Sequence, residues 1–310
     1  MLEFVVKRIL NGLMVLWLII TLTFMLLRLM PGGPFTMDRK LPPAILKNLE
    51  TKYKLNDPLI VQYCDYFKGL FRGDLGPSFK YEDRTVNSII ADGAPVSFQL
   101  GIKSVLLSLL LGIPAGVISA LKHGKWQDRI LSLVTVAGIA IPGFIVASLL
   151  MIVLALKLNL LPTAMWGGWK YQVMPILALS LGPMAVITRL TRTSMLDVLG
   201  QDYIKLAYAK GLSDYTVLWK HALPNSLIPV VTITGPLIAG IVTGSFVIES
   251  IFAIPGVGKA FVTSIYNRDY TLILGMTIFY SALLIFLNIV VDIIYPLLDP
   301  RITMLTKKEA

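Results

Sequence analysis

Six apolar runs dominate the pattern of hydrophobic and polar positions along the chain. A bilayer-spanning helix needs about 20 mostly apolar residues, and each run is about that long. The pattern therefore predicts an all-α membrane protein with six transmembrane helices, at residues 9–30, 99–121, 130–156, 171–190, 227–251 and 271–295. The first run follows Lys7 and Arg8 as in a signal peptide, but it is longer than a signal-peptide core and no small-residue cleavage site follows, so we expect a retained helix.

Interior prolines interrupt several of these runs. Proline removes a backbone hydrogen bond and kinks a helix, which is tolerated where neighbouring helices or a water-filled cavity satisfy the freed groups. Two interpretations stay open: irregular packing, or bent helices that line a path which opens and closes. The prolines are Pro114, Pro142, Pro175, Pro183, Pro229 and Pro236.

The segment 31–98, after the first run, is polar but patterned. The apolar positions of "PLIVQYCDYFKGLF" follow helical spacing, and "RGDLGPSFKYED" is typical of turns. A segment of this length and pattern predicts a small folded external cap rather than a loose linker. The cap either packs on the helices or contacts a ligand directly. Cys64 lies in it, and we expect no chemistry from that thiol.

Composition agrees with a membrane protein. Of 310 residues, 55% are hydrophobic and only 15% charged, with a mean hydropathy of +0.74. One cysteine and two histidines exclude an internal disulfide, a cysteine cluster and a multi-histidine site, so we expect no metal site. The net charge of +10 is better explained by basic residues kept on the cytoplasmic side than by nucleic-acid binding, and we expect no nucleic-acid partner.

The basic residues also predict the orientation. With the N-terminus inside, thirteen lysines and arginines fall in the inner segments and four in the short outer loops, which predicts cytoplasmic termini at both ends. The inner residues are Lys7, Arg8, Lys122, Lys125, Arg129, Arg189, Arg192, Lys205, Lys210, Lys220, Arg301, Lys307 and Lys308. The outer ones are Lys157, Lys170, Lys259 and Arg268.

Between the fourth and fifth runs stands "QDYIKLAYAKGLSDYTVLWKHALPNS", residues 201–226. The predicted topology places it in the cytoplasm. Each of its charges would cost about 2.5–3.5 kcal/mol at mid-bilayer, so we expect the stretch to stay out of the hydrocarbon. Gly211 is a natural helix stop and Ser213 a natural N-cap, which predicts two short helices around a turn. The charges are Asp202, Lys205, Lys210, Asp214 and Lys220.

These two short helices are amphipathic. Two interpretations are open: a helix pair lying on the lipid headgroups, or a compact docking knob for a cytoplasmic partner. One predicted stripe holds Tyr203, Leu206, Ala207 and Lys210, and the other holds Val217, Leu218 and His221.

The stretch resembles the conserved cytoplasmic loop of ABC importer permeases, in which an E-A-A triplet precedes a glycine and an I-x-L-P sequence ends the loop. With that glycine on Gly211, the triplet falls on Lys205, Leu206 and Ala207, and the end falls on His221, Ala222, Leu223 and Pro224. Ala207, Gly211, Leu223 and Pro224 match, whereas the Glu, first Ala and Ile positions differ.

The rest of the chain is similar to the B-type transmembrane subunit of oligopeptide permeases. The similar segments include "LMPGGPF", "GDLGPSFKY", "LTRTSMLDVL", "TGSFVIESIFAIPGVG", "NRDYTLI" and "DPRI". The resemblance implies the type I ABC importer fold and a peptide substrate, with dipeptides, nickel or another small solute as alternatives. The implied division is a first helix at 1–30, an external segment at 31–98, a core at 99–298 that includes the cytoplasmic coupling hairpin 201–224, and a cytoplasmic tail at 299–310.

The resemblance also implies a subunit of a larger machine in a bacterial cytoplasmic (inner) membrane. Expected partners are a second homologous permease, two ATP-binding subunits on the cytoplasmic face and an external peptide-binding protein. We expect ATP and Mg²⁺ on the partner subunits, and no catalytic residue or cofactor in this chain. The residues expected to contact the ATP-binding subunits are Lys205, Leu206, Ala207, Lys210, Gly211, Leu212, Ser213, Asp214, His221, Leu223 and Pro224.

Three further residues are weaker candidates for substrate or binding-protein contact. Glu249 stands near the outer end of the fifth run, where a ligand contact competes with a local pair or a solvated site. Gly256 and Gly258 belong to "IPGVGKAF", which fails the phosphate-loop spacing and is expected to form an external turn. A stand-alone ion-coupled transporter, the competing hypothesis, would usually show paired repeats and mid-bilayer carboxylates, and the sequence shows neither clearly.

Overall fold

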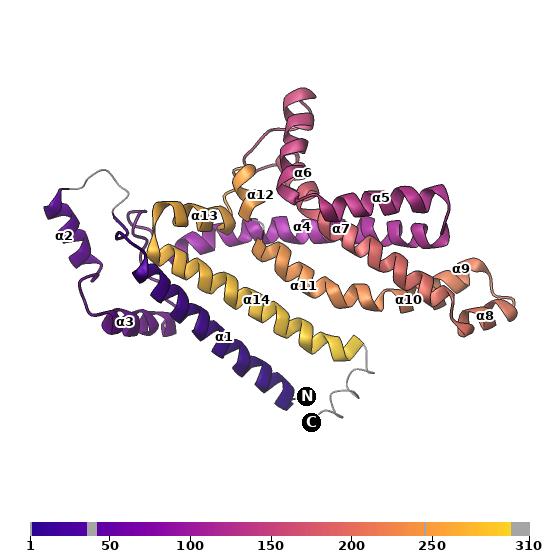
Figure 1. The fold of residues 1–310 in the computed structure, drawn as a ribbon, viewed down its shortest axis with the longest axis horizontal. Coiled ribbons are helices and arrows are strands. Elements are labelled where there is room, and N and C mark those ends of the chain that lie inside the picture. Colours follow the sequence, from indigo (N-terminus) through magenta and orange to yellow (C-terminus); the bar gives the residue numbers. More distant parts are fainter. Residues whose placement is uncertain (1, 36–41, 245, 299–310) are drawn as a thin grey trace. The chain divides into compact units, whose positions relative to one another are not determined.

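The fold is described here from a computed structural model, which describes residues 2–35, 42–244 and 246–298 (Figure 1). Within those ranges the chain is helical, and its only extended pairing is an isolated bridge between Pro77 and Thr85. This confirms the predicted all-α class. The predicted tail 299–310 lies outside the described residues. The helices form two compact units, which are described separately below.

All six predicted apolar runs are helical. Among the described residues, four helices are long and apolar enough to cross a membrane: α1 (Leu2–Leu29), α4 (Val86–Leu121), α7 (Trp169–Leu199) and α14 (Tyr270–Leu298). Helix α4 begins well before the predicted start at residue 99, so the end of the predicted external segment is already helical. The fifth run contains α11 (Ile228–Gly244) and α12 (Phe246–Ile251), and residue 245 between them lies outside the described residues.

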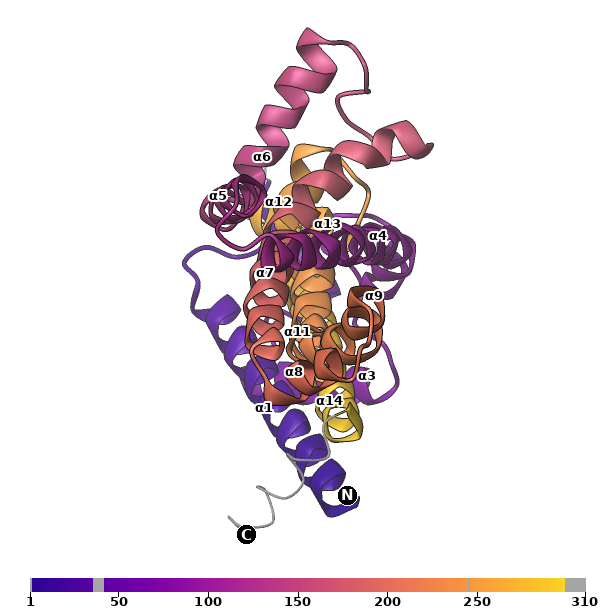
Figure 2. The ribbon, with the colours of Figure 1, turned by 90° about the vertical axis from the view of Figure 1, so that its right-hand side faces the viewer.

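The third run differs from the single helix that the pattern predicts. It consists of α5 (Trp126–Ala140) followed by α6 (Gly143–Leu150) and the π-helix η1 (Met151–Lys157), with a bend of 105° between the two parts (Figure 2). The break falls at Ile141, which has extended backbone angles because it precedes Pro142. Pro142 therefore breaks its helix, whereas Pro175 and Pro183 lie inside the continuous α7.

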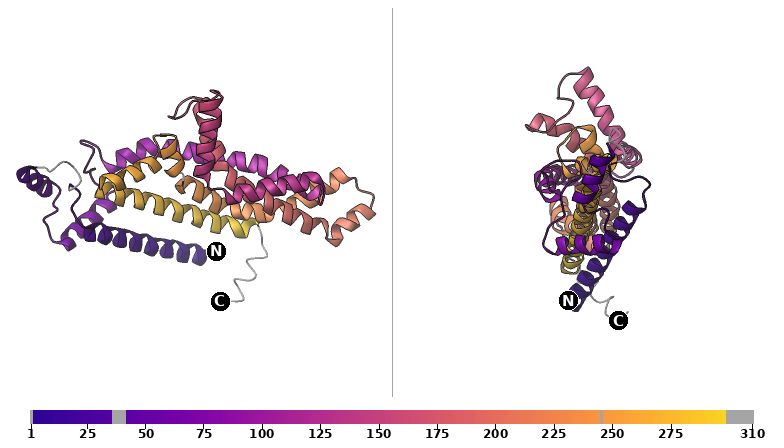
Figure 3. Two further views of the ribbon diagram at one scale, coloured as in Figure 1. Left: turned by 45° about the horizontal axis from the view of Figure 1, so that its top comes forward. Right: turned by 90° about the vertical axis from the view of Figure 1, so that its left-hand side faces the viewer.

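The first unit comprises residues 1–97 and 255–285. Here α1 and α14 lie side by side, joined by a buried apolar cluster that the aromatic side chains of α3 cover (Figure 3). The predicted helix of the external segment is α3 (Leu59–Phe71), and α2 (Pro43–Lys52) precedes it. Helix α13 (Val257–Asn267) packs on the start of α4, where Gly93 approaches the Val257 backbone nitrogen closely.

A buried carboxylate ties the turns of the external segment to this unit. Asp269 accepts a hydrogen bond from the Leu272 backbone N–H at 3.1 Å, which caps the N-terminus of α14. It also accepts from the Phe79 backbone N–H at 3.1 Å and from the Ser78 hydroxyl. These bonds hold residues far apart in sequence together.

The second unit comprises, among the described residues, 98–244, 246–254 and 286–298, and α7 packs against α4, α5 and α6 within it. Close approach depends on glycines: a Cβ added at Gly116 of α4 would lie 2.5 Å from the Thr191 Cβ of α7. Gly112 stands one turn earlier on the same face and meets Ile187. This small-xxx-small spacing is typical of packed transmembrane helices.

Candidate docking site

The stretch after α7 folds into the predicted helical hairpin, which we call the 201–224 hairpin. Its first arm is α8 (Asp202–Ala209). Its second arm winds continuously through α9 (Asp214–Thr216), the π-helix η2 (Val217–Ala222) and α10 (Leu223–Ser226) (Figure 1). The structure therefore brings all eleven predicted coupling residues into one compact element. Lys205, Leu206 and Ala207 lie on the first arm, Lys210 to Ser213 in the turn, and the rest on the second arm.

The turn has the chemistry expected of its glycine. Gly211 has a φ of +80°, in the left-handed region that favours glycine. Its N–H donates to the Tyr208 carbonyl at 2.9 Å, and the Leu212 N–H donates to the Ala207 carbonyl at 3.3 Å. This pair of bonds is the Schellman arrangement that ends many helices. The predicted helix stop is confirmed.

The second arm begins with the predicted cap. The Ser213 hydroxyl accepts from the Thr216 backbone N–H at 3.4 Å, which confirms the N-cap. Pro224 has no N–H to donate, and the six residues before Leu223 are wound as a π-helix. The Asn225 side-chain amide donates to the His221 carbonyl at 2.7 Å. An irregular arm ending in proline is thus still hydrogen bonded locally.

One face of the hairpin is buried against the rest of the second unit. Its arms share an apolar cluster with the end of α4 and the last turns of α7, so the hairpin is packed on these helices, which we call its seat, and is not a loose loop. The buried members of this cluster are Ala120, Met195, Ile204, Ala207, Val217 and Ala222.

The opposite face exposes large apolar side chains, and here the predicted stripe on α8 was wrong. Ala207 points into the buried cluster with Ile204, whereas Tyr203 and Leu206 are exposed, Leu206 by 56%. The predicted stripe mixed both faces because it includes the buried Ala207 together with exposed residues, and it left out the buried Ile204. The exposed set is Tyr203, Leu206, Tyr208, Leu212, Tyr215 and Trp219.

Charges surround this apolar face. The Lys205 Nζ lies 2.8 Å from Asp202 Oδ1, on the exposed side of α8. Partial burial, together with the neighbouring Asp214 carboxylate, raises the pKa of Tyr208. Lys210 is exposed at the end of the first arm. The hairpin therefore offers apolar contact area with a charged border, as expected of a protein-binding surface.

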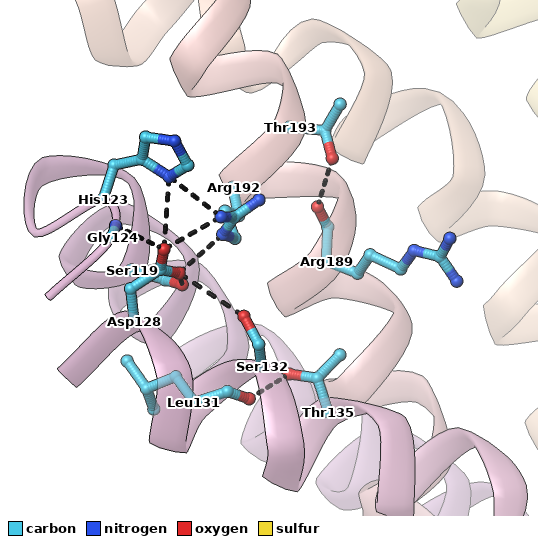
Figure 4. Close-up of polar contacts among 10 residues, drawn as sticks. All are labelled: Ser119, His123, Gly124, Asp128, Leu131, Ser132, Thr135, Arg189, Arg192 and Thr193. Carbon is cyan, nitrogen blue, oxygen red and sulfur yellow. Dashed lines mark hydrogen bonds and ion pairs between the residues drawn. The ribbon is translucent and has the colours of Figure 1, made fainter. Parts of the chain in front are cut away.

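Next to the seat of the hairpin lies a charge network that sequence reasoning missed, which we call the Asp128 bridge (Figure 4). Arg192 of α7 donates two hydrogen bonds to the Asp128 carboxylate, from Nε to Oδ1 at 2.7 Å and from Nη2 to Oδ2 at 2.9 Å. The Ser119 hydroxyl and the Gly124 N–H donate to the same carboxylate. Only 6% of the Asp128 side chain is exposed. The bridge fastens the turn between α4 and α5 to α7.

His123 lies at the edge of the Asp128 bridge. Its Nδ1 is 3.0 Å from Arg192 Nη2 and 3.2 Å from Asp128 Oδ2. Arginine only donates, so Nδ1 accepts from Arg192 when it carries no proton and donates to Asp128 when it carries one. The sequence carries only a weak signal for this network, because Asp128 stands two residues before the apolar run 130–156, as many charges stand at the edges of such runs.

The three weaker candidates lie outside the hairpin. Glu249 is fully buried in α12 of the second unit, so the solvated alternative for it does not hold in this structure. Gly256 is the N-cap of α13 and Gly258 is buried in its first turn, both in the first unit. The Val257 N–H between them donates to the Ser97 hydroxyl of α4 at 3.1 Å. The expected external turn is therefore a packed helix start.

The long apolar helices indicate a membrane protein. Residues 112–304 match the family described as binding-protein-dependent transport system inner membrane component, and residues 1–101 match the N-terminal region of that class of protein. The chain belongs to this family.

Curated relatives agree along nearly the whole chain. It is 48% identical over 304 residues to the dipeptide transport system permease protein DppB of Bacillus subtilis, covering 98% of this chain and 99% of that one. It is 46% identical over 304 residues to the oligopeptide transport system permease protein OppB of Salmonella typhimurium, covering 97% and 99%. These relatives are named as transport permeases, not as enzymes.

Solved structures share the fold at low identity. The inward-facing MetNI methionine ABC transporter matches with a TM-score of 0.57 and 16% identity, over 68% of this chain and 96% of that chain. An amino acid ABC transporter crystallised with histidines matches with a TM-score of 0.55 and 11% identity, over 67% and 94%. These matches support the predicted type I ABC importer fold.

Proposed function

We propose that this chain is a permease subunit of an ATP-driven, binding-protein-dependent importer of oligopeptides. The substrate assignment rests on the near-complete alignment with a dipeptide permease at 48% identity and an oligopeptide permease at 46% identity. Dipeptides are the second candidate substrate, because the dipeptide relative is as similar as the oligopeptide one. The substrate class is therefore a peptide, and the peptide length is what an experiment has to decide.

The partners follow from the family. A binding-protein-dependent permease of an ABC importer works with ATP-binding subunits and a binding protein. We propose in addition that a second, homologous permease completes the pathway, that two ATP-binding subunits sit on the cytoplasmic face, and that both termini of this chain lie there. ATP and Mg²⁺ are held by the ATP-binding subunits in this account.

The 201–224 hairpin is the proposed contact with the ATP-binding subunits. Two observations support this. Large apolar side chains such as Leu206 and Tyr215 are exposed on it, although it is too charged to enter the bilayer. The opposite face is seated on α4 and α7, so a displacement of the hairpin is passed to the ends of these helices rather than absorbed by a flexible loop.

The Asp128 bridge strengthens this role. It couples α7 to the turn between α4 and α5 beside the seat of the hairpin, through a carboxylate that Arg192 holds bidentately. In the proposed cycle the ends of these helices then move as one body when the ATP-binding subunits close. The bridge serves as a positioning element and takes no part in chemistry.

The substrate assignment is tested by ATP turnover of the reconstituted complex with its binding protein. We expect stimulation by peptides and none by nickel. Stimulation by dipeptides but not by longer peptides would move the substrate to the second candidate, and stimulation by nickel alone would contradict a peptide importer. A further arm uses liposomes that contain only this chain. Peptide uptake driven by a proton gradient in that arm would favour an ion-coupled transporter and contradict the proposal.

A further inference from the structure

The first unit contains a cavity that the proposed function does not use. Its volume is about 270 Å³, and all of its lining residues belong to the first unit. The last turns of α1 form one wall, the start of α14 a second, and the α2–α3 region a third. Lining residues that matter below are Phe24, Arg28, Gln62, Tyr66 and Tyr270.

The wall from α1 carries a cation that has no counter-ion among the described residues. The Arg28 guanidinium carbon lies 5.0 Å from the centroid of the Phe24 ring and 5.9 Å from that of Tyr270. Its Nε is buried and has no hydrogen-bond partner in the described part of the chain, where no carboxylate pairs with Arg28 either. The two rings attract the guanidinium, but its buried N–H still costs free energy unless an acceptor reaches it.

Two further polar groups of this cavity are buried and unpartnered among the described residues. The Tyr66 hydroxyl is one. Burial raises its pKa, so it remains a hydrogen-bond donor at neutral pH. Gln62 Oε1 is the other, and its amide orientation is fixed because Nε2 donates to the Leu55 carbonyl at 3.1 Å and to the Asp57 carbonyl at 2.7 Å. The cavity thus offers two donors suited to an oxyanion and one acceptor suited to a hydroxyl.

The acidic residues of the cavity do not neutralise Arg28. Asp65 Oδ2 lies 3.5 Å from Lys54 Nζ, and Asp65 Oδ1 lies 3.4 Å from Lys68 Nζ, so each carboxylate oxygen already has a lysine partner. Asp57 is a lining residue, but Lys52 and Lys54 also line the cavity. Cationic groups therefore outnumber acidic ones, which favours an anionic ligand over a neutral or cationic one.

The depth of Arg28 indicates where that ligand comes from. The apolar stretch of α1 runs from Val5 to Leu29, so Arg28 stands at its last turn, at the level of the lipid headgroups. Leu22 and Leu26 stand deeper along α1, are exposed by 52% and 66%, and face the surroundings of the helix. A phospholipid places its phosphate and its acyl chains at these two levels simultaneously.

We propose that this cavity binds the headgroup of an anionic phospholipid. Arg28 and Tyr66 donate to the phosphate, Gln62 accepts from a headgroup hydroxyl, and the acyl chains follow the exposed side of α1 at Leu22 and Leu26. Phosphatidylglycerol has this chemistry. Because the cavity joins α1, α14 and the α2–α3 region, the bound lipid holds the external segment on the spanning helices.

The test uses the full chain, purified, stripped of lipid and titrated with phosphatidylglycerol while bound lipid is counted by native mass spectrometry. We expect one tight site per chain. Arg28→Gln should weaken it by at least about tenfold, the equivalent of one lost charge-assisted hydrogen bond. Arg72→Gln is the matched control, because Arg72 is an exposed residue at the end of α3 that does not line the cavity, and binding should be unchanged.

Tyr66→Phe is the second variant, since it keeps the ring and removes only the hydroxyl. Tyr66→Phe should lower the affinity for phosphatidylglycerol several-fold, and it tests the site even if Arg28→Gln fails to fold. Diacylglycerol, which has no phosphate, should not occupy the site. Equal affinity for diacylglycerol, or no effect of either variant, overturns the proposal.

Two ligands without acyl chains separate the remaining sources of an oxyanion. Glycerol phosphate should bind far more weakly than the lipid, and equal binding would assign the cavity to a free phosphate ester. A peptide with a free carboxylate should not displace the lipid. Displacement of the lipid by that peptide, but not by the same peptide with a C-terminal amide, would assign the cavity to a carboxylate ligand and overturn the lipid proposal.

Discussion

At the scale of single residues, the backbone of Gly211 is the most specific feature of the hairpin. A Cβ at this position would meet nothing within 4 Å, so a substitution costs backbone strain rather than a clash. A β-branched residue with φ near +80° costs about 1–2 kcal/mol. We expect Gly211→Val to separate ATP hydrolysis from uptake while membrane insertion stays normal. Gly211→Asn, which tolerates this conformation, should transport nearly as well.

Transport assays with ATP turnover measured in parallel decide this prediction. Uptake by Gly211→Val that matches the unchanged protein would mean that the turn geometry does not matter for coupling.

Arg192 carries a second residue-scale prediction. Removing it leaves the buried Asp128 carboxylate without its cation, which typically costs about 3–5 kcal/mol. We expect Arg192→Gln to lower the thermal stability of the purified chain strongly and Asp128→Asn to lower it less. The double variant should be more stable than the sum of the two losses predicts. His123→Ala is the control and should change little, because the His123 side chain is 62% exposed. Strictly additive losses would show that the two residues do not act as a pair.

What the sequence could predict at this scale was local chemistry. Gly211 and Ser213 act on neighbours within a few positions, so their roles follow from residue type and order. Asp128 and Arg192 are far apart in the chain, and each looks like an ordinary charge at the edge of an apolar run. Only the packing of α5 on α7 brings them together.

At the scale of helices, the contact between α4 and α7 depends on glycine. The Thr188 hydroxyl of α7 also donates to the Gly112 carbonyl at 3.2 Å. We expect Gly116→Ala to destabilise the chain, because its new methyl would lie 2.5 Å from the Thr191 Cβ and about the same distance from backbone. Gly240→Ala in α11 is the control: nothing lies within 4 Å of its Cβ, so it should be neutral or mildly stabilising.

Thermal unfolding of the purified chain in detergent measures both variants. Equal midpoints for Gly116→Ala and the unchanged protein would mean that α4 and α7 are less tightly packed than these distances indicate.

Helix positions were predictable, but breaks within them were not. The length of the apolar runs placed the helices to within a few residues at most ends, whereas α1 and α4 begin earlier and α7 ends later than predicted. Proline content did not tell the broken third run from the continuous α7, which contains Pro175 and Pro183. Whether a proline bends or breaks a helix depends on the neighbours that satisfy the freed backbone groups, and these come from tertiary packing.

At the scale of the whole molecule, this chain is one part of an importer. Its family explains the spanning helices, and the exposed apolar face of the 201–224 hairpin gives the proposed partner a surface to bind. The amphipathic pattern alone could not tell which face of the hairpin contacts the chain's own core and which face is exposed. Both faces carry apolar residues, such as Ile204 on the buried face and Leu206 on the exposed one.

The central claim is that the 201–224 hairpin faces the cell interior, where the ATP-binding subunits are. Cys64 is the only cysteine in the sequence, so a Cys64→Ser background accepts a single new cysteine, either at Lys210 or, as the external control, at Lys68. A membrane-impermeant maleimide on intact cells should label the Lys68→Cys chain at once and the Lys210→Cys chain only after the membrane is opened. Labelling of Lys210→Cys in intact cells would contradict the account.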